Sequence, residues 1–396
     1  MQPHVATPTL EKIIFDQVAT QPLTIQPVAL QAIISGTVSQ LLQEIEERQK
    51  AATARQAPTI TSAAMAFLAD RSGGGHCTDK TVRENLAIVK LVISIIGDKP
   101  VDSITHQDMQ ATRQTLLQLP PNITRSPRFR NLTIGQILQL KPACRMSLRS
   151  VNKYLARFSA FLNWCVRVGY IPANPFRGGQ IRIKANAMGA RKPFSVADLG
   201  LLFSPYNFKF RPSESWRGYI ILLALTTGMR LEEICQLQCA DIVNVDGITC
   251  IDINDNGDKK LKTQSSRRVI PIHPILLERF DFLGFVGHQT SFATRLFPAL
   301  HKVDGSYGHG YSKWFARYRE RCGVTGDGKC FHSFRHLVAT TLKTADVPVY
   351  VAAEILGHAV PGMTYGHYGK ESSVEKMAKA LEHLRFDEIL RPVFSR

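Results

Sequence analysis

The sequence predicts a multidomain protein in which an all-helical domain is followed by a domain that mixes helices and strands. Its 396 residues suffice for two or three domains, because single domains usually contain roughly 100–200 residues. Apolar residues recur at helical spacing from Pro58 to about Tyr170, whereas Ile248 to Ile253 alternates apolar and polar residues like a strand. These patterns divide the chain into an N-terminal helical segment of unknown role, a helical domain, a basic linker and a mixed α+β domain with a C-terminal tail: residues 1–57, 58–175, 176–195 and 196–396.

The net charge of +17 is concentrated in the helical domain and the start of the linker. Residues 58–185 contain eighteen Lys and Arg against six Asp and Glu, a net of +12, and no acidic residue occurs between Asp108 and Asp198. Because soluble surfaces usually intersperse both signs, this stretch indicates a surface for a polyanion, with nucleic acid as the leading candidate. Residues 1–57 carry a net charge of −1, which argues against DNA binding there.

The remaining composition narrows the class of protein. Eight cysteines without a CxxC pair indicate neither a disulfide framework nor a structural zinc site, and we expect no metal and no cofactor. Zinc binding by Cys322, Cys330, His332 and His336 is an alternative, although zinc motifs pair their ligands at tighter spacings. The most apolar run, residues 219–225, is far shorter than the ~20 residues of a membrane span. We expect a cytoplasmic, nucleoid-associated protein without a membrane partner.

Four helices are expected in the helical domain, with a basic, irregular insertion between the third and the fourth: residues 62–70, 81–96, 105–119 and 148–168, with the insertion at 120–142. Gly97 and Gly169 stand where the second and fourth helices should end, since glycine readily adopts the left-handed conformation of a helix stop.

The fourth helix carries an apolar stripe and a separate basic face. Arg149, Lys153 and Arg157 lie away from the stripe and are expected to point outward. The linker adds further basic residues, among them Arg182 and Lys184. We expect these five side chains to contact a DNA backbone. A merely solubilising face is the alternative.

The mixed domain begins with a helix that Ser195 should cap, with Asp198 three residues on in a capping-box-like arrangement. Further helices and a hairpin of two strands are expected: helices at 216–225, 274–282 and 311–322, and strands at 248–253 and 268–272. Gly228 closes the first of these helices, and Arg230 stands at the start of the next. Lys262 falls in the connection between the two strands.

The C-terminal stretch holds several side chains suited to chemistry on a phosphate. His332 and Arg335 stand three residues apart, so on a helix they share one face and can reach one anion together. Gly357 should stop the helix before it, which places His358 at a helix end. Tyr368, ten residues further on, is the candidate nucleophile.

Transesterification of a phosphodiester requires the kinds of group that this domain offers: Arg230, Lys262, His332, Arg335, His358 and Tyr368. Two arginines can hold the non-bridging oxygens, and a lysine can protonate the departing 5′-oxygen. A histidine can take the proton of the tyrosine, whose free pKa of about 10 makes it a poor nucleophile at neutral pH. Glu233 is interpreted as an orienting or structural residue, since a carboxylate beside a phosphate would repel it. Tyr365 is a rival nucleophile.

In their order and spacing these motifs resemble the tyrosine recombinase, or phage integrase, family over residues 58–385. The resemblance rests on a first-arginine box, a lysine hairpin, a His-x-x-Arg box and a second histidine box: Thr226-Thr227-Gly228-Met229-Arg230-Leu231-Glu232-Glu233, Leu261-Lys262-Thr263 with Arg268-Val269-Ile270-Pro271, His332-Ser333-Phe334-Arg335-His336, and Leu356-Gly357-His358. Tyr368 stands at the distance from His358 that the family's nucleophile has.

The resemblance implies a SAM-like helical core-binding domain and a mixed catalytic domain that form a C-shaped clamp around double-stranded DNA. It implies a 3′-phosphotyrosyl intermediate without metal or ATP, and four protomers that act on two paired sites through a Holliday junction. Such an enzyme would integrate or excise a phage or another mobile element, and an accessory DNA-bending or directionality factor is a further candidate partner.

Two other functions remain as alternatives. One is a non-catalytic DNA-binding relative, although such a protein has no use for the complete set of six residues. The other is a strand-relaxing enzyme like the type IB topoisomerases, which uses similar tyrosine chemistry on a single duplex.

Overall fold

The computed structural model describes residues 39–40, 43, 57–73, 79–183, 192–210, 215–326, 328–359 and 373–394. The chain divides into two compact units, Met1–Ile183 and Lys184–Arg396. Each unit has its own hydrophobic core. Among the described residues, no helix combines the length and the apolar character that a membrane crossing requires.

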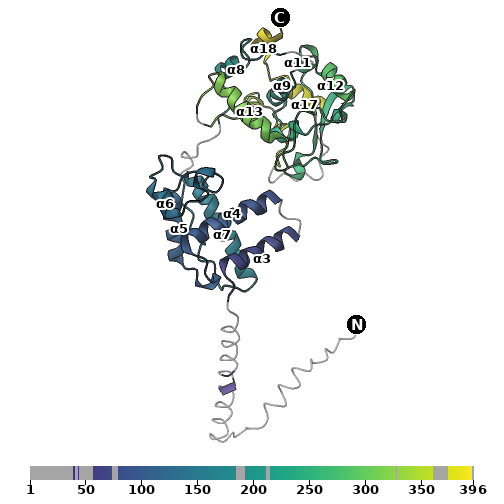
Figure 1. Ribbon diagram of the computed structural model, residues 1–396. Coiled ribbons are helices and arrows are strands. Elements are labelled where there is room, and N and C mark those ends of the chain that lie inside the picture. The colour runs from purple at the N-terminus through teal and green to yellow at the C-terminus, as the bar shows by residue number, and fades with distance from the viewer. Residues whose placement is uncertain are drawn as a thin grey trace, which may run out of the picture. The chain divides into compact units, whose positions relative to one another are not determined.

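The N-terminal unit is built from five helices and two short 3-10 turns in its described part: α3 (Ile60–Gly73), α4 (Asp79–Ile96), η1 (Val101–Ser103), α5 (His106–Gln118), η2 (Pro127–Phe129), α6 (Ile134–Gln139) and α7 (Leu148–Arg167). Helix α4 packs against α3, α5 and α7, and Figure 1 shows α3 and α4 side by side. Gly97 ends α4 with a φ of 84°. Thr105 caps α5 in a capping box with Asp108.

Helix α7 holds this unit together through the apolar stripe that the sequence predicts. The side chains of the stripe are at most 2% exposed: Val151, Leu155, Phe158, Leu162 and Cys165. Their spacing puts them on one face of the helix, where they contact the core formed with α3, α4 and α5.

The insertion at 120–142, expected to be irregular, contains the short helix α6. Thr133 caps this helix: its hydroxyl accepts from the amide of Gln136 at 3.2 Å, and the Gln136 side chain accepts from the amide of Thr133 at 2.8 Å. This is a complete capping box. The expectation of an irregular insertion was therefore wrong for residues 134–139.

The C-terminal unit contains ten helices and one antiparallel sheet in its described part: α8 (Val196–Leu202), α9 (Trp216–Thr227), α10 (Leu231–Cys235), β1 (Ile242–Val245), β2 (Ile248–Ile253), β3 (Arg268–Pro271), α11 (Pro274–Glu278), α12 (Phe282–Thr290), α13 (Gly308–Arg321), α14 (Ser333–Thr344), α15 (Val349–Leu356), α17 (Val374–Leu381) and α18 (Asp387–Phe394). The strand order is β1–β2–β3, with Ile251 opposite both Ile242 and Ile270. Helices α15 and α17 contact β3.

Strand β1 was not expected from the sequence. It is joined to β2 by Asp246 and Gly247, whose φ values are 52° and 82°. Positive φ at both central residues suits the right-handed twist of a tight hairpin. The expected helix at 274–282 is also two helices, because Asp281 takes a φ of 47° and caps α12 through its carboxylate.

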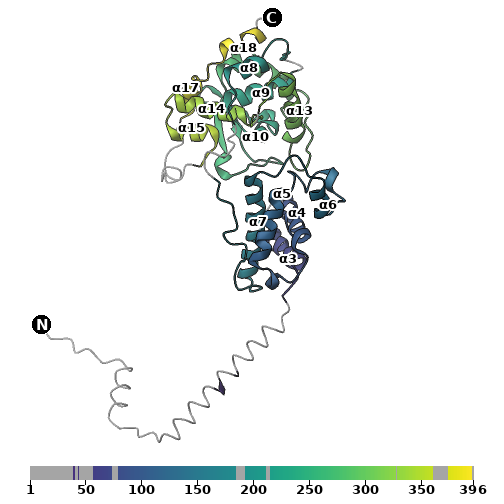
Figure 2. The ribbon, with the colours of Figure 1, turned by 90° about the vertical axis from the view of Figure 1, so that its left-hand side faces the viewer.

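Helix α9 is the centre of the C-terminal unit. Ten of its twelve residues are buried, as expected for a helix that is apolar on every side. Figure 2 shows α9 inside the unit, and α10 and α14 pack against it. The helix ends at Gly228, which has a φ of 66°. This left-handed stop turns the chain so that Arg230 lies at the N-cap of α10.

Candidate active site

Arg230 is held by a buried carboxylate. Its Nη1 donates to Oε1 of Glu233 at 2.6 Å and to Oγ of Ser266 at 3.2 Å, while its backbone amide donates to Oε2 of Glu233 at 3.0 Å. Glu233 is only 4% exposed. Burial opposes the ionisation of Glu233, but the charges and hydrogen bonds of Arg268 and Arg230 outweigh it, so its pKa lies below the ordinary value. Glu233 therefore contacts both the backbone amide and the guanidinium of Arg230, and its orienting or structural role stays a prediction.

Arg268 completes this arrangement from β3, and sequence reasoning did not assign it to the site. Its Nη2 donates to Oε2 of Glu233 at 3.0 Å, its Nε to the carbonyl of Ile355 at 2.9 Å, and its Nη1 to the carbonyl of Ser266 at 2.6 Å. The side chain is 7% exposed. One planar guanidinium thus joins α10, α15 and the turn before β3, a role for which its fixed fork of donors is suited.

Arg335 lies in the first turn of α14 and is 3% exposed. Its Nη1 donates to the carbonyl of Gly228 at 3.0 Å, and its Nη2 donates to the carbonyl of Leu356. Desolvation, followed by the charge of Arg230, lowers the pKa of Arg335 to about 10. The guanidinium therefore remains charged at neutral pH while it lies almost wholly out of water.

Two left-handed glycines bring the arginines and the second histidine together. Gly357 ends α15 with a φ of 63°, as predicted, and its carbonyl accepts from Nη2 of Arg230 at 3.1 Å. The carbonyl of Gly228 accepts from Arg335. A Cβ at Gly228 would lie 2.8 Å from Cδ2 of Leu356, so the two helix ends are in close contact. Each glycine carbonyl binds one of the two predicted arginines.

His358 follows Gly357 at the helix end and is exposed. Its backbone amide donates to the carbonyl of Ala353 at 2.9 Å, which fixes the position of the residue. Desolvation lowers the pKa of its imidazole, and the positive charges of Arg335, Arg230 and Arg268 lower it further against the opposing charge of Glu233. The imidazole is therefore neutral at pH 7 and able to accept a proton.

For the other predicted catalytic residues, the structure gives fewer contacts to the two arginines. His332 is half-buried at the N-cap of α14, one turn before Arg335, and its ring centroid lies 5.0 Å from that of His336. Lys262 is exposed in the connection between β2 and β3, as predicted. Its neighbour Thr263 is hydrogen-bonded to Ser266, which accepts from Arg230. Tyr365 and Tyr368 lie outside the described residues.

The positively charged residues predicted to contact DNA differ in their exposure and in the ion pairs that they form. Arg149 and Arg182 are exposed, and Lys184 lies outside the described residues. Lys153 and Arg157 were expected to point outward, but both form ion pairs with a carboxylate on α4, that of Glu84. These contacts leave the side chain of Arg157 only 28% exposed.

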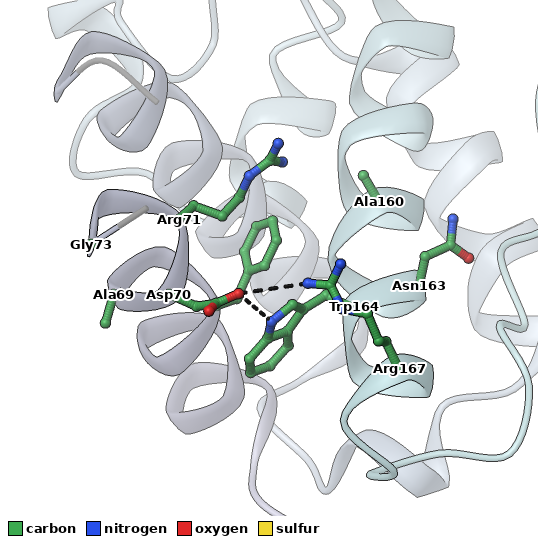
Figure 3. A pocket seen from close by; sticks show the side chains of 9 residues that line it. Ala69, Asp70, Arg71, Gly73, Ala160, Asn163, Trp164 and Arg167 are labelled. Atoms are coloured by element: carbon green, nitrogen blue, oxygen red, sulfur yellow. Dashed lines mark hydrogen bonds and ion pairs between the residues drawn. The ribbon is translucent and has the colours of Figure 1, made fainter. Parts of the chain in front are cut away.

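A groove of about 750 Å³ lies between α3 and α7 in the N-terminal unit (Figure 3). Nε1 of Trp164 donates to Oδ2 of Asp70 at 2.9 Å, and Arg167 forms an ion pair with the same oxygen at 3.6 Å. The ring of Phe67 forms part of the wall. Because the charged groups in it largely satisfy one another and none of the predicted site residues lines it, this groove is not the candidate active site.

The convergent groups can bind and polarise an anion. Arg230 and Arg335 supply fixed positive charge beside a neutral histidine, which suits the stabilisation of an oxyanion during attack on a phosphodiester. Nowhere in the described part of the chain do three His, Cys, Asp or Glu side chains gather closely enough to bind a metal ion.

Comparison with known proteins connects this geometry to a family. Residues 205–374 match the phage integrase family. A tyrosine recombinase XerC-like protein of Caldanaerobacter subterraneus subsp. tengcongensis is 26% identical over an alignment of 258 residues that covers 56% of this chain and 61% of that protein. The matched part of the chain thus spans about three fifths of the length of this relative.

Two solved structures share the fold. The Tn1549 transposon integrase (residues 82–397) in complex with circular intermediate DNA has a TM-score of 0.54 at 17% identity, with 82% of this chain and 99% of that chain covered. A lambda integrase tetramer bound to a Holliday junction has a TM-score of 0.50 at 17% identity, with 88% and 86% covered. The similarity to the phage integrase family therefore covers residues 205–374 of the C-terminal unit, and the fold is shared with these solved integrases.

Proposed function

We propose that this protein is a site-specific DNA recombinase that cuts and rejoins double-stranded DNA through a 3′-phosphotyrosyl intermediate. The observation that carries the proposal is the convergence of Arg230, Arg335 and His358 at the two left-handed glycines. Two permanently charged guanidiniums beside a neutral imidazole match the needs of phosphodiester transesterification. A protein that only bound DNA would not require a buried arginine held in this way.

In the proposed reaction, the hydroxyl oxygen of Tyr368 attacks the phosphorus while a histidine, His358 or His332, takes its proton. The tyrosyl O–P bond forms and the bond to the 5′-oxygen breaks. Lys262 gives a proton to the departing 5′-oxygen, so charge and protons balance. Arg230 and Arg335 hold the two non-bridging oxygens throughout. The reverse attack by the 5′-hydroxyl of a partner strand reseals the DNA without ATP.

The same proposal assigns roles to the parts of the chain. Residues 58–175 would be a SAM-like core-binding domain, 176–195 a basic linker, and 196–396 the catalytic domain, which together close as a C-shaped clamp on DNA. Four protomers would act on two paired sites through a Holliday junction, with integration or excision of a mobile element as the outcome. We place this activity in the cytoplasm, at the nucleoid. The charge of residues 58–185 supports a polyanionic partner.

A suicide substrate tests the proposal. Sequencing the joints between the encoding element and its flanking DNA gives the site, and a nicked duplex of that site then traps the covalent intermediate in EDTA. The wild-type protein should form a 3′-linked adduct, and mass spectrometry should locate the DNA on Tyr368. Tyr368→Phe should bind the duplex without forming the adduct, whereas Tyr365→Phe should still form it. The reverse pattern would identify Tyr365 as the nucleophile, and the absence of any adduct would contradict the proposed activity.

Formation of junctions on paired sites separates recombination from strand relaxation. A recombinase should join strands between two duplexes and yield a four-way junction. A topoisomerase-like enzyme should relax a single supercoiled plasmid that lacks the paired sites.

A further inference from the structure

Three basic side chains converge on one carboxylate in the N-terminal unit. Glu84, on α4, accepts a hydrogen bond from Nη2 of Arg125 at 2.6 Å through its Oε1. Its Oε2 lies 3.0 Å from Nη2 of Arg157 and 3.7 Å from Nζ of Lys153, both on α7. Arg157 also donates to Oδ1 of Asn85 at 3.3 Å. Three cations from two other segments of the chain therefore meet around a single anionic group.

This cluster carries an excess of positive charge. Three cations and one carboxylate leave a net charge of +2. Burial opposes the ionisation of Glu84, but Lys153, Arg157 and Arg125 outweigh it, so the pKa of the carboxyl lies below its ordinary value and the group is charged at neutral pH. Positive charge in excess of its internal partner attracts further anions.

The exposures of the four side chains indicate which of them an incoming anion meets first. The side chains of Arg125 and Lys153 are 64% and 53% exposed, whereas those of Arg157 and Glu84 are 28% and 21% exposed. The cations thus reach solvent, while the carboxylate lies deeper among them. Arginine and lysine arranged around one anion in this way are typical of a phosphate site, where forked and point-like donors share the oxygens.

The surrounding surface belongs to the most basic part of the chain. Arg149 stands one turn before Lys153 on α7 and is exposed. Residues 109–197 contain no acidic side chain, so neither α7 nor the segment that holds Arg125 can supply a carboxylate to this cluster, and α4 supplies it. A backbone phosphate that approaches the exposed face of α7 therefore finds the cations of the cluster already paired with the carboxylate of Glu84.

We propose that Arg125, Lys153 and Arg157 form a binding subsite for a backbone phosphate of duplex DNA and that Glu84 is its built-in competitor. On binding, the phosphate takes the place of the carboxylate, and Glu84 loses its ion pairs. The inference rests on the proposed function, since DNA is the ligand that it names. It adds to that function a specific role for Glu84: its carboxylate lowers the affinity for DNA, because a phosphate that binds at this subsite has to displace it.

Glu84→Gln in the full-length protein tests the competition. The amide keeps the size of the side chain and removes its charge, so the phosphate no longer has to displace a carboxylate. Duplex affinity, measured by fluorescence anisotropy with a labelled random-sequence duplex, should rise about tenfold at low salt, the scale expected for losing several partly exposed ion pairs. Asp102→Asn is the matched control, because it removes one exposed negative charge from the same unit. It should change the affinity by less than about twofold.

Two further variants keep the test independent of any effect of Glu84 on folding. Arg125→Gln and Lys153→Gln should each weaken binding to every duplex and reduce the slope of log K against log salt by about 1, as loss of one phosphate contact does. Lys153→Gln should also cancel part of the gain in the Glu84→Gln background. Unchanged or weaker binding by a normally folded Glu84→Gln protein would overturn the inference, as would an unchanged salt slope in both basic-residue variants. If the wild-type protein fails to bind duplex DNA at any salt concentration, the proposed function itself fails.

Discussion

Arg268 donates to three acceptors that come from separate parts of the C-terminal unit, and through Glu233 it determines where Arg230 lies. It is a positioning residue in our proposal, because its contacts reach the predicted catalytic arginine through that carboxylate and through Ser266. A guanidinium can make all three contacts in one plane, whereas a lysine ammonium is a point charge without a forked geometry.

Arg268→Lys should therefore retain the charge and lose the geometry. Single-turnover cleavage should fall by about 100-fold, the scale expected when a catalytic group is misplaced by about 1 Å. Duplex affinity should stay the same. Arg267→Lys is the matched control, since Arg267 is the preceding residue, is exposed and pairs only at the surface with Asp255. Equal cleavage rates for the two variants would show that Arg268 does not position the site.

The lowered pKa of His358 predicts how cleavage depends on pH. A histidine that accepts the proton of the tyrosine must be neutral, and desolvation together with Arg335, Arg230 and Arg268 favours the neutral form. The folded pKa lies below the ordinary value of 6.5, so activity should persist below pH 6.5 and fall only at lower pH. The measurement is the single-turnover rate on a suicide substrate between pH 5 and 8. A rate that already falls by half above pH 6.5 would contradict this assignment.

At the scale of secondary-structure elements, the ends of α9 and α15 form the frame of the site. Both helices stop at glycines in the left-handed conformation, and the carbonyls of these glycines accept from Arg335 and Arg230. A side chain at Gly357 would meet Nη1 of Arg268 at 2.6 Å. The helix stop and the guanidinium therefore occupy adjoining space without room for a methyl group.

Gly357→Ala should accordingly disturb stability and activity together. A non-glycine residue at a φ of 63° costs on the order of 1–2 kcal/mol, and the clash with Arg268 adds to this. Thermal unfolding and single-turnover cleavage are the measurements. Gly310→Ala in α13 is the control, because a Cβ there meets nothing within 4 Å. It should leave cleavage unchanged and stabilise the protein by about 0.5–1 kcal/mol. Similar stability losses in both variants would refute the proposed role of Gly357.

Local signals account for the parts of the fold that the sequence predicted. Gly97, Gly228 and Gly357 end helices, and Ser195 caps α8 together with Asp198, because each of these features depends on residues within one turn. Two local signals were overlooked. The capping box of α6 and the Asp-Gly turn before β2 are both visible in the sequence, but strand β1 has only four residues and little alternation to mark it.

Contacts between distant residues were beyond the reach of sequence reasoning. Arg268 lies 35 residues from Glu233 and 87 from Ile355, and no spacing rule connects such positions. For the same reason the pairing of Glu84 with Arg125, 41 residues away, was not foreseen. Motif order singled out Arg230, Arg335 and His358, whereas Arg268, which joins α10 to α15 beside them, could be found only in three dimensions.

At the scale of the whole molecule, the distribution of charge predicts a strong response to salt. A protein that neutralises Z phosphates releases their counterions, so log K should fall with a slope of about −0.9Z against log salt. With a net charge of +17, of which residues 58–185 carry +12, the intact protein should lose affinity steeply between about 50 and 200 mM salt. Anisotropy titrations across this range measure the slope. A flat response would argue against DNA as the partner.

Because arginines join two helix ends, assembly of the candidate site depends on the folding of the whole C-terminal unit. The carbonyls that hold Arg335 and Arg230 belong to Gly228 and Gly357, which are more than a hundred residues apart in the sequence and meet only when α9, α14 and α15 are packed together. Any partial unfolding that separates α15 from α9 therefore removes one acceptor from each arginine: the carbonyl of Gly357 from Arg230, and that of Gly228 or Leu356 from Arg335. In the proposed recombinase, a nascent, damaged or proteolysed chain in which these helices have separated should therefore lack an assembled active site and should not cleave DNA.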